Sequence, residues 1–107
     1  MARQRTRTKC IYGAKGAFLV VEREVVVLNR AGIHARPAAL IVQTAGAFIS
    51  RIEFRKERET INAKSIMGII TLGASYKSKL TIVADGDDET EAVEKLAELF
   101  DKRFEED

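Results

Sequence analysis

The chain has 107 residues, of which 46% are hydrophobic and 32% charged, the balance of a globular protein with one domain and one hydrophobic core. Its formal net charge of +2 is unevenly distributed, since residues 1–20 carry five basic and no acidic side chains, and the other 13 basic and 16 acidic residues give −3. That distribution does not fit a protein that binds nucleic acid over its whole surface. No apolar run is long enough for a transmembrane helix or a secretory signal. The single cysteine, Cys10, excludes an internal disulfide and suits a reducing cytoplasm.

The first 17 residues show no hydrophobic periodicity, and Gly13 and Gly16 interrupt them. We therefore expect residues 1–20 to be a flexible basic extension and residues 21–107 to form the folded domain. The extension has two interpretations. Either it has no binding function, as a solvated leader or as the product of a start codon assigned too far upstream, or it binds nucleic acid or acidic lipid. Because charge runs are usually solvated, we expect no direct contact with nucleic acid or membrane.

The remaining residues predict seven elements in the order strand, helix, strand, strand, helix, strand, helix. The strands are recognised by β-branched or alternating residues and the helices by apolar residues spaced three and four apart. This order predicts an α+β domain with helices on one face of a mostly antiparallel sheet. The predicted strands cover residues 19–28, 49–55, 59–62 and 79–85, and the predicted helices cover residues 35–48, 65–72 and the segment that follows Asp88.

Two local patterns refine these elements. Asp88 and Glu91 have the spacing of a capping box at the start of the last helix. The two middle strands form a predicted hairpin, although the Glu57-Arg58 turn lacks the usual Asn-Gly or Asp-Gly. The buried stripe of the last helix is predicted to be Val93, Leu96, Ala97, Phe100 and Phe104.

The one histidine, His34, lies between a loop and the first predicted helix, followed by Arg36 and Pro37. Free amides and the helix dipole make a helix start an anion site, and a guanidinium adds donors suited to phosphate oxygens. A neutral imidazole at this place can attack a phosphoryl donor. The spacing favours this function over a histidine that merely packs or caps at a helix start.

Other chemistry has little support in the sequence. A metal site is not expected, because there is no second histidine and Cys10 lies in the extension. A Ser–His–acid hydrolase is not expected either, because the chain has no nucleophile elbow. We expect no cofactor.

Ser65, at the start of the short second helix, has two interpretations. A serine at this place is most simply an N-cap, and the spacing alone favours that role. The alternative is a regulatory phosphorylation site, because a phosphate there would put negative charge beside an apolar surface. The apolar residues that follow, Ile66, Met67 and Ile70, could equally be core or an exposed docking surface, with Met67 and Ile70 the better docking candidates.

Two segments resemble the signature sites of the HPr family, the histidine-containing phosphocarriers of the phosphoenolpyruvate-dependent sugar phosphotransferase system. They are residues 31–39, Ala-Gly-Ile-His-Ala-Arg-Pro-Ala-Ala, and residues 64–68, Lys-Ser-Ile-Met-Gly. The resemblance covers roughly residues 22–104 and leaves the extension unmatched. It implies an open-faced β-sandwich in which three helices lie on one face of a four-stranded antiparallel sheet, in the order βαββαβα.

The resemblance also implies roles for single residues. His34 matches the histidine that is phosphorylated on Nδ1, and Arg36 matches the arginine that positions the phosphate. Ser65 matches the serine that a dedicated kinase modifies in many bacteria, which raises the regulatory interpretation above the simple cap. The helix with Ile66, Met67 and Ile70, together with the first helix and its Leu40, matches the docking face.

The partners implied by the family are enzyme I, sugar-specific IIA domains, HPr kinase/phosphorylase and a catabolite-control transcription regulator. A carrier with these partners is a cytoplasmic phosphoryl-transfer intermediate, not a stand-alone catalyst, and a domain with one core is most simply a monomer. A second hypothesis is a regulatory module that acts mainly through Ser65 without sugar transport.

Overall fold

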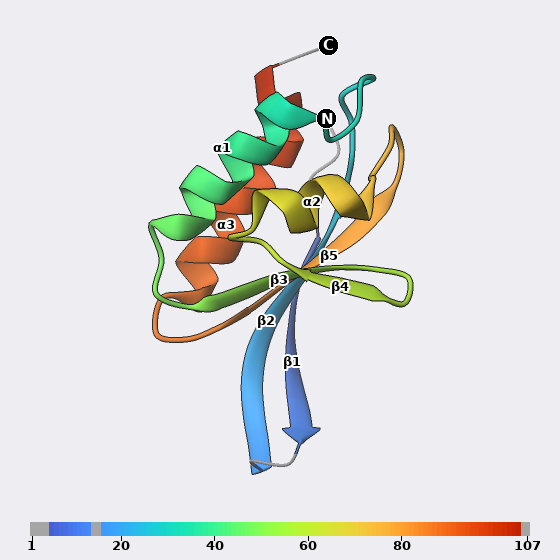
Figure 1. Cartoon of the computed structure of the whole chain (residues 1–107). Coiled ribbons are helices and arrows are strands. Elements are labelled where there is room, and N and C mark those ends of the chain that lie inside the picture. Colours follow the sequence, from blue (N-terminus) through green and yellow to red (C-terminus); the bar gives the residue numbers. More distant parts are fainter. Residues whose placement is uncertain (1–4, 14–15, 106–107) are drawn as a thin grey trace.

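The computed structural model describes residues 5–13 and 16–105, with side chains from Val21 to Glu105. Three helices lie on one side of a twisted five-stranded sheet (Figure 1). All the strand pairs are antiparallel, in the spatial order β1-β2-β5-β3-β4. The strands are β1 (Arg5–Gly13), β2 (Gly16–Val26), β3 (Arg51–Lys56), β4 (Glu59–Asn62) and β5 (Lys79–Asp85), and the helices are α1 (Ala35–Gly46), α2 (Ile66–Leu72) and α3 (Glu89–Asp101).

The predicted α+β architecture is confirmed. Strands β2, β5, β3 and β4 form the expected four-stranded antiparallel sheet, and the three helices cover one face of it. Helix α3 packs across β2, β5 and β3, while α1 packs against α3 and α2 (Figure 1). None of the helices among the described residues is long and apolar enough to cross a membrane.

Strand β1 corrects the prediction for the start of the chain, where no regular structure was expected before Leu19. Arg5–Gly13 pairs with β2 from Arg5 opposite Glu24 to Gly13 opposite Gly16. The prediction failed because it searched for alternating apolar residues, whereas this segment begins by alternating basic residues with threonine, a β-branched strand former. The rest of that prediction, for residues 1–4 and 14–15, lies outside the described residues.

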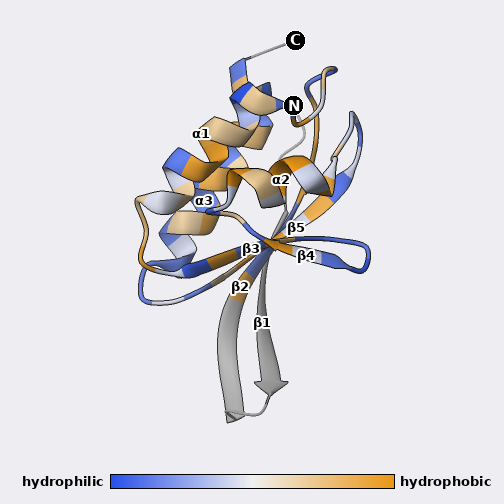
Figure 2. Cartoon of the chain, viewed as in Figure 1, coloured by the Kyte–Doolittle hydropathy of each residue, from blue (hydrophilic) through white to orange (hydrophobic). Residues whose placement is uncertain are grey.

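The hydrophobic core lies between the sheet and the helices. Alternate residues of β3 and β5 are buried there, among them Ile52, Phe54 and Ile82, as the period of two predicts. Figure 2 shows hydrophobic residues along the helices and strands, and a hydrophilic turn between β3 and β4. The Phe100 ring meets the Phe54 ring edge-on, with ring centroids 5.9 Å apart.

The last helix buries its predicted stripe, but its cap differs from the prediction. Asp88 is the N-cap residue, yet its side chain makes no capping hydrogen bond. Its carboxylate accepts hydrogen bonds from the amides of Ile49 and Ser50, at 2.9 and 3.0 Å, and from the Ser50 hydroxyl. The capping-box prediction is therefore wrong, because the Asp88 carboxylate is turned toward the segment that leads from α1 into β3.

A single turn, η1 (Arg103–Glu105), follows α3 and carries the last predicted stripe residue. The φ angles of Arg103, Phe104 and Glu105 are 55°, 53° and 60°, in the left-handed region that costs L-residues free energy. The Phe104 side chain is nonetheless buried, and its ring meets the Phe100 ring with centroids 4.9 Å apart. Packing of that ring holds the turn in place.

Candidate functional site

The loop from Asn29 to His34 connects β2 to α1 and forms a tight turn. The Gly32 amide donates to the Asn29 carbonyl at 3.0 Å, and the buried Asn29 side chain donates from Nδ2 to the Gly32 carbonyl at 2.7 Å. Gly32 has a φ of 74°, which favours glycine. The turn therefore depends on the asparagine that begins it and on the glycine that ends it.

This loop lies directly on the segment that joins α2 to β5. The Ile33 amide donates to the Ala74 carbonyl at 2.9 Å. A Cβ atom on Gly32 would lie only 2.9 Å from that same carbonyl oxygen and 3.1 Å from the Cα of Ser75. The contact leaves no room for a side chain at Gly32, so the backbone before His34 is fixed by close packing.

His34 is the N-cap residue of α1, with an extended backbone (φ −102°, ψ −164°) and an exposed side chain that makes no capping hydrogen bond. Its carbonyl accepts from the Ala38 amide at 3.0 Å and so begins the helix. The amides of the first turn point out of the helix start, and Pro37 has none to satisfy. Because that turn contains no acidic residue, the positive end of the helix dipole is not offset within it.

Arg36 lies two residues beyond His34, with its side chain exposed. One of its terminal nitrogens donates to the Phe104 carbonyl at 2.8 Å, which ties the start of α1 to the turn η1. This bond uses one of the five N–H donors of a guanidinium. The sequence placed Arg36 near His34 correctly but gave no sign of its contact with the end of the chain.

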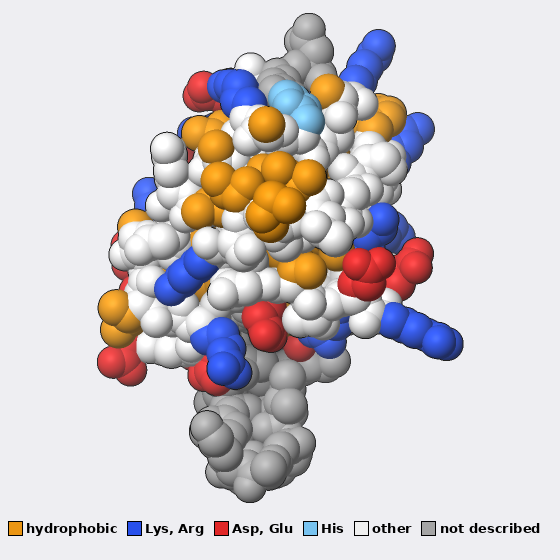
Figure 3. Space-filling view, viewed as in Figure 1, with side chains coloured by type: hydrophobic (Ala, Val, Ile, Leu, Met, Phe, Trp, Pro, Cys, Tyr) orange, Lys and Arg blue, Asp and Glu red, His pale blue; other side chains and the backbone are white. Residues whose placement is uncertain are grey.

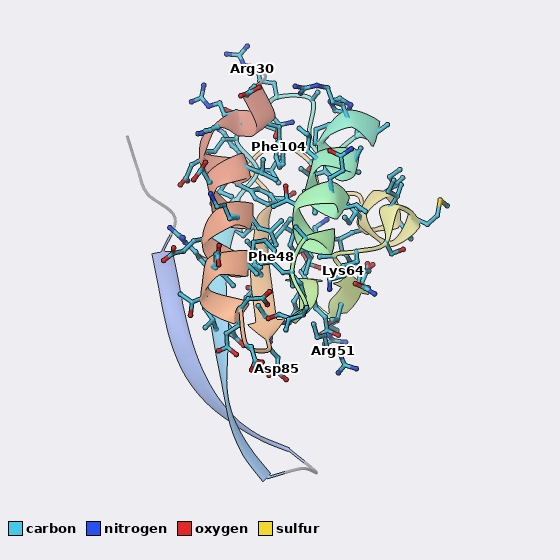
Figure 4. The ribbon with its side chains drawn as sticks, turned by 90° about the vertical axis from the view of Figure 1, so that its left-hand side faces the viewer. Arg30, Phe48, Arg51, Lys64, Asp85 and Phe104 are labelled. Carbon is cyan, nitrogen blue, oxygen red and sulfur yellow. The ribbon has the colours of Figure 1, made fainter. Side chains whose placement is uncertain are left out.

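Ser65 is the N-cap residue of α2, and its hydroxyl oxygen accepts from the Gly68 amide at 3.1 Å. The predicted cap is therefore confirmed. The neighbouring Lys64 side chain donates to the Phe48 carbonyl at 2.7 Å and links this helix start to the segment after α1 (Figure 4). Ser65 itself is half-buried beside the apolar surface of α2.

Helix α2 leaves much of its apolar surface exposed. Ile69 and Leu72 face the core, whereas the exposed fractions of Ile66, Met67 and Ile70 are 43%, 70% and 41%. Leu40 on α1 is only partly buried against the core. Figure 3 shows a hydrophobic patch over these helices, with the one imidazole of the chain close to it on the same face. We call Leu40, Ile66, Met67 and Ile70 the apolar patch.

A separate hollow of about 620 Å³ lies on the sheet face that the helices leave uncovered. Charged side chains line it, among them Glu22 and Arg55, which form an ion pair at 2.8 Å. No site residue predicted from the sequence lines this hollow. Within the described part of the chain, no three His, Cys, Asp or Glu side chains gather as a metal site.

Comparison with known proteins now identifies the family. The sequence model of the family described as "PTS HPr component phosphorylation site" matches residues 21–102, a span that contains His34, Ser65 and the apolar patch. The chain belongs to the HPr family. HPr proteins are phosphocarriers of the sugar phosphotransferase system, and that general role holds for this chain.

Individual HPr proteins match over most of their length. The phosphocarrier protein HPr of Treponema pallidum is 48% identical over 88 residues, which are 82% of this chain and 100% of that protein. The HPr-like protein Crh of Bacillus subtilis is 46% identical over 78 residues, 73% of this chain and 92% of Crh. A crystal structure of HPr from Thermoanaerobacter tengcongensis superposes with a TM-score of 0.78 at 46% identity, covering 80% of this chain and 97% of that one.

Three features of this HPr site were not predicted from the sequence. They are the buried side chain of Asn29, the packing of Gly32 on Ala74, and the hydrogen bond from Arg36 to the carbonyl of Phe104. From the sequence, Gly32 was placed only in the motif at residues 31–39, before His34. A glycine two residues before a candidate nucleophile could have suggested a close backbone contact. Nothing in the sequence indicated the partner of Arg36, which is a backbone oxygen 68 positions away.

Proposed function

We propose that this chain accepts a phosphoryl group on Nδ1 of His34 from phosphorylated enzyme I and donates it to a sugar-specific IIA domain. The observation that carries this proposal is the position of His34, an exposed imidazole at the N-terminal end of α1 within the segment matched by the family. Both steps take place in complexes with other proteins. The chain is thus a transfer intermediate and not a stand-alone catalyst.

The two steps are displacements at phosphorus. In the first, the lone pair of the neutral His34 Nδ1 forms a bond to phosphorus as the bond between phosphorus and enzyme I breaks. In the second, the P–Nδ1 bond breaks, the imidazole keeps the electron pair, and the phosphoryl group passes to the acceptor. The first-turn amides of α1 and the Arg36 guanidinium stabilise the negative charge of the group in both directions.

The apolar patch is the proposed docking surface for both partners. Its exposed residues lie on the same face as the imidazole, so a partner that covers the patch also reaches His34 (Figure 3). Methionine suits a surface with several partners, because its flexible side chain adapts to each. A carrier must release its partners quickly, which fits a modest interface.

Ser65 is the proposed site of regulation by an HPr kinase/phosphorylase. Its hydroxyl lies at the start of α2, beside Ile66 and Met67 of the apolar patch. A phosphate on Ser65 adds about two negative charges at neutral pH and makes this apolar surface a poorer docking site. The same phosphoserine is the proposed binding site for a catabolite-control transcription regulator.

The similarity to Crh favours a second candidate, a regulatory module that acts mainly through Ser65. A solution structure of Crh described as the Bacillus subtilis catabolite repression HPr is 44% identical, with a TM-score of 0.58 and coverage of 74% of this chain. Phosphoryl transfer from this chain to a IIA domain distinguishes the two candidates, because only the carrier performs it. For either one we propose a cytoplasmic monomer, and analytical ultracentrifugation tests the oligomeric state.

The deciding experiment is phosphorylation of the purified chain by phosphoenolpyruvate and enzyme I, with His34→Ala and Ser65→Ala alongside. We expect one acid-labile, base-stable phosphate on the parent and on Ser65→Ala, and none on His34→Ala. Absence of phosphate from the parent, with an enzyme I shown to be active on another HPr, would reject the carrier function. The regulatory module would then be the better hypothesis.

A further inference from the structure

Asn29 is a fully buried polar residue that faces the backbone leading to His34. Its relative exposure is 0%, and its Nδ2 donates to the Gly32 carbonyl oxygen at 2.7 Å. Burying a side-chain amide costs free energy unless it is hydrogen-bonded, so this bond is needed once Asn29 is inside the fold. Aspartate has almost the same shape but has no N–H to donate.

The oxygen that Asn29 binds also receives the amide of His34. The His34 N–H donates to the Gly32 carbonyl at 3.2 Å, so two donors meet at one acceptor. Between them, the Ile33 N–H donates to the Ala74 carbonyl at 2.9 Å. The orientation of the Gly32 carbonyl therefore sets the direction of the backbone at Ile33 and at His34.

Gly32 is held from two sides. On one side, a Cβ atom would lie 2.9 Å from the Ala74 carbonyl oxygen, so the backbone already touches that segment. On the other side, the Asn29 amide binds its carbonyl. Loss of the Asn29 donor leaves the Gly32 carbonyl with the longer bond from the His34 amide, at 3.2 Å, as its remaining hydrogen bond here. The loop can then turn this carbonyl, and with it the backbone of His34, away from the present orientation.

We propose that Asn29 is a positioning residue for phosphoryl transfer: through the Gly32 carbonyl it fixes the backbone of His34 at the start of α1. The inference rests on the proposed carrier function. Asn29 is buried and does not touch the phosphoryl group. In the geometry for transfer, the imidazole and the first-turn amides face the same phosphorus, and Asn29 lowers the free energy needed to reach that geometry. Misplacement of a reacting group by about 1 Å can reduce the rate on the order of a hundredfold.

The test compares Asn29→Asp and Asn29→Ala with two matched controls. Asn62→Asp makes the same change of side chain and charge at an exposed asparagine whose Oδ1 accepts from the Lys64 amide at 2.8 Å, a role that aspartate retains. Ile52→Val removes one buried methylene near the start of β3 and lowers stability without changing a residue of the loop. Initial rates of phosphorylation by enzyme I give kcat and KM, and NMR gives hydrogen exchange at the Ile33 and His34 amides.

For both Asn29 variants we expect kcat to fall roughly tenfold to a hundredfold with KM nearly unchanged, and faster exchange at these two amides. Both controls should keep the parent's kcat. A purely structural role predicts that Ile52→Val and the Asn29 variants lose activity in proportion to stability, and that result would overturn the inference. So would parental kcat in the folded Asn29→Asp variant.

Three outcomes keep the test decisive. If the Asn29 variants do not fold, the parent alone is measured for scalar coupling between the Asn29 side-chain amide and the Gly32 carbonyl, and absence of that coupling overturns the inference. A parent that enzyme I does not phosphorylate rejects the carrier function itself. A phosphorylated parent whose Asn29 variants keep the parental kcat rejects only the role of Asn29.

Discussion

Arg36 donates a hydrogen bond to the backbone carbonyl of Phe104 at 2.8 Å, although 68 positions separate the two residues. The bond joins the first turn of α1 to the left-handed turn that follows α3. A guanidinium in this place has two tasks in the proposed cycle, contact with η1 and contact with a phosphoryl group on His34. Both tasks use directed N–H donors and not charge alone.

Replacing Arg36 tests that requirement. Since lysine keeps the charge but loses the planar fork of donors, we expect Arg36→Lys and Arg36→Ala both to slow phosphorylation of His34 by enzyme I, by roughly 10²-fold for alanine and less for lysine. Stopped-flow or quenched-flow rates give the effect, and Arg30→Ala, an exposed arginine of the same loop, is the control. Parental rates for Arg36→Ala would show that this guanidinium has no part in transfer.

Met67 tests the apolar patch as a docking surface. Because its side chain is 70% exposed, Met67→Asp should fold normally while placing a charge in the apolar patch, the proposed docking surface. We expect KM for enzyme I to rise about tenfold or more with kcat little changed. Ile49→Asp provides a matched control, because Ile49 is 77% exposed but lies beyond the end of α1 and not on α2. Equal effects of the two substitutions on KM would contradict a specific patch.

Asp88 makes the stability of the domain sensitive to acid. Hydrogen bonds to its carboxylate, first from the Ser50 hydroxyl and then from the Ile49 and Ser50 amides, lower the pKa of Asp88 below its ordinary value. A lowered pKa in the folded state gives stability that is complete above the unfolded-state pKa of about 3.9 and is lost as the pH falls through the folded-state value. Ser50→Ala should therefore reduce this acid-dependent part of the stability.

Urea unfolding between pH 7 and pH 2.5 measures that effect. The difference in free energy of unfolding between the parent and Asp88→Asn should be largest near neutral pH and shrink below about pH 4. Asp87→Asn, at the exposed neighbouring position, serves as the control. A difference that stays constant over this range would mean that the carboxylate bonds contribute nothing that depends on pH.

The β3–β4 turn offers a stabilising substitution. Glu57 has a φ of 54°, in the left-handed region where glycine avoids a steric cost of roughly 1–2 kcal/mol. We expect Glu57→Gly to raise the free energy of unfolding by about 0.5–1 kcal/mol, because part of that gain is offset by greater freedom in the unfolded chain. Arg58→Gly, at the next position of the same turn, should lower it, and thermal unfolding of the two variants gives the comparison.

Much of this fold was predictable from the sequence, because hydrophobic periodicity follows the core. The alternation in residues 51–55 and 79–85 located two inner strands, and the spacing of Val93, Leu96 and Phe100 located the buried stripe of α3. Strand β1 was missed because it begins with basic residues that alternate with threonine, and the search was for alternating apolar residues. The partner predicted for the Asp88 side chain was also wrong. Local spacing suggested a helix cap, whereas in the fold the Asp88 carboxylate accepts hydrogen bonds from the amide and the hydroxyl of Ser50.

The candidate site likewise has features that were predictable from the sequence and features that were not. The positions of His34 and Ser65 followed from local sequence, since a helix start is a local feature. Local sequence left open whether the apolar residues of α2 are core or exposed, and the structure shows three of them exposed. The contacts that hold the loop, from Asn29 to Gly32 and from Ile33 to Ala74, were not predictable. They depend on a buried amide and on a backbone carbonyl 41 positions from its donor.

Strand β1 changes which strand forms the border of the sheet. Because it pairs with β2 along Arg5–Gly13, β2 is an inner strand with neighbours on both sides over residues 21–24. A chain shortened to residues 21–107 would keep every other strand pair but leave the outer amides and carbonyls of β2 without that neighbour. Open strand edges invite pairing with a second molecule, so the short form should self-associate more readily than the full chain. Strand β1 would thus protect the protein from self-association through β2, whether or not β1 itself binds a partner.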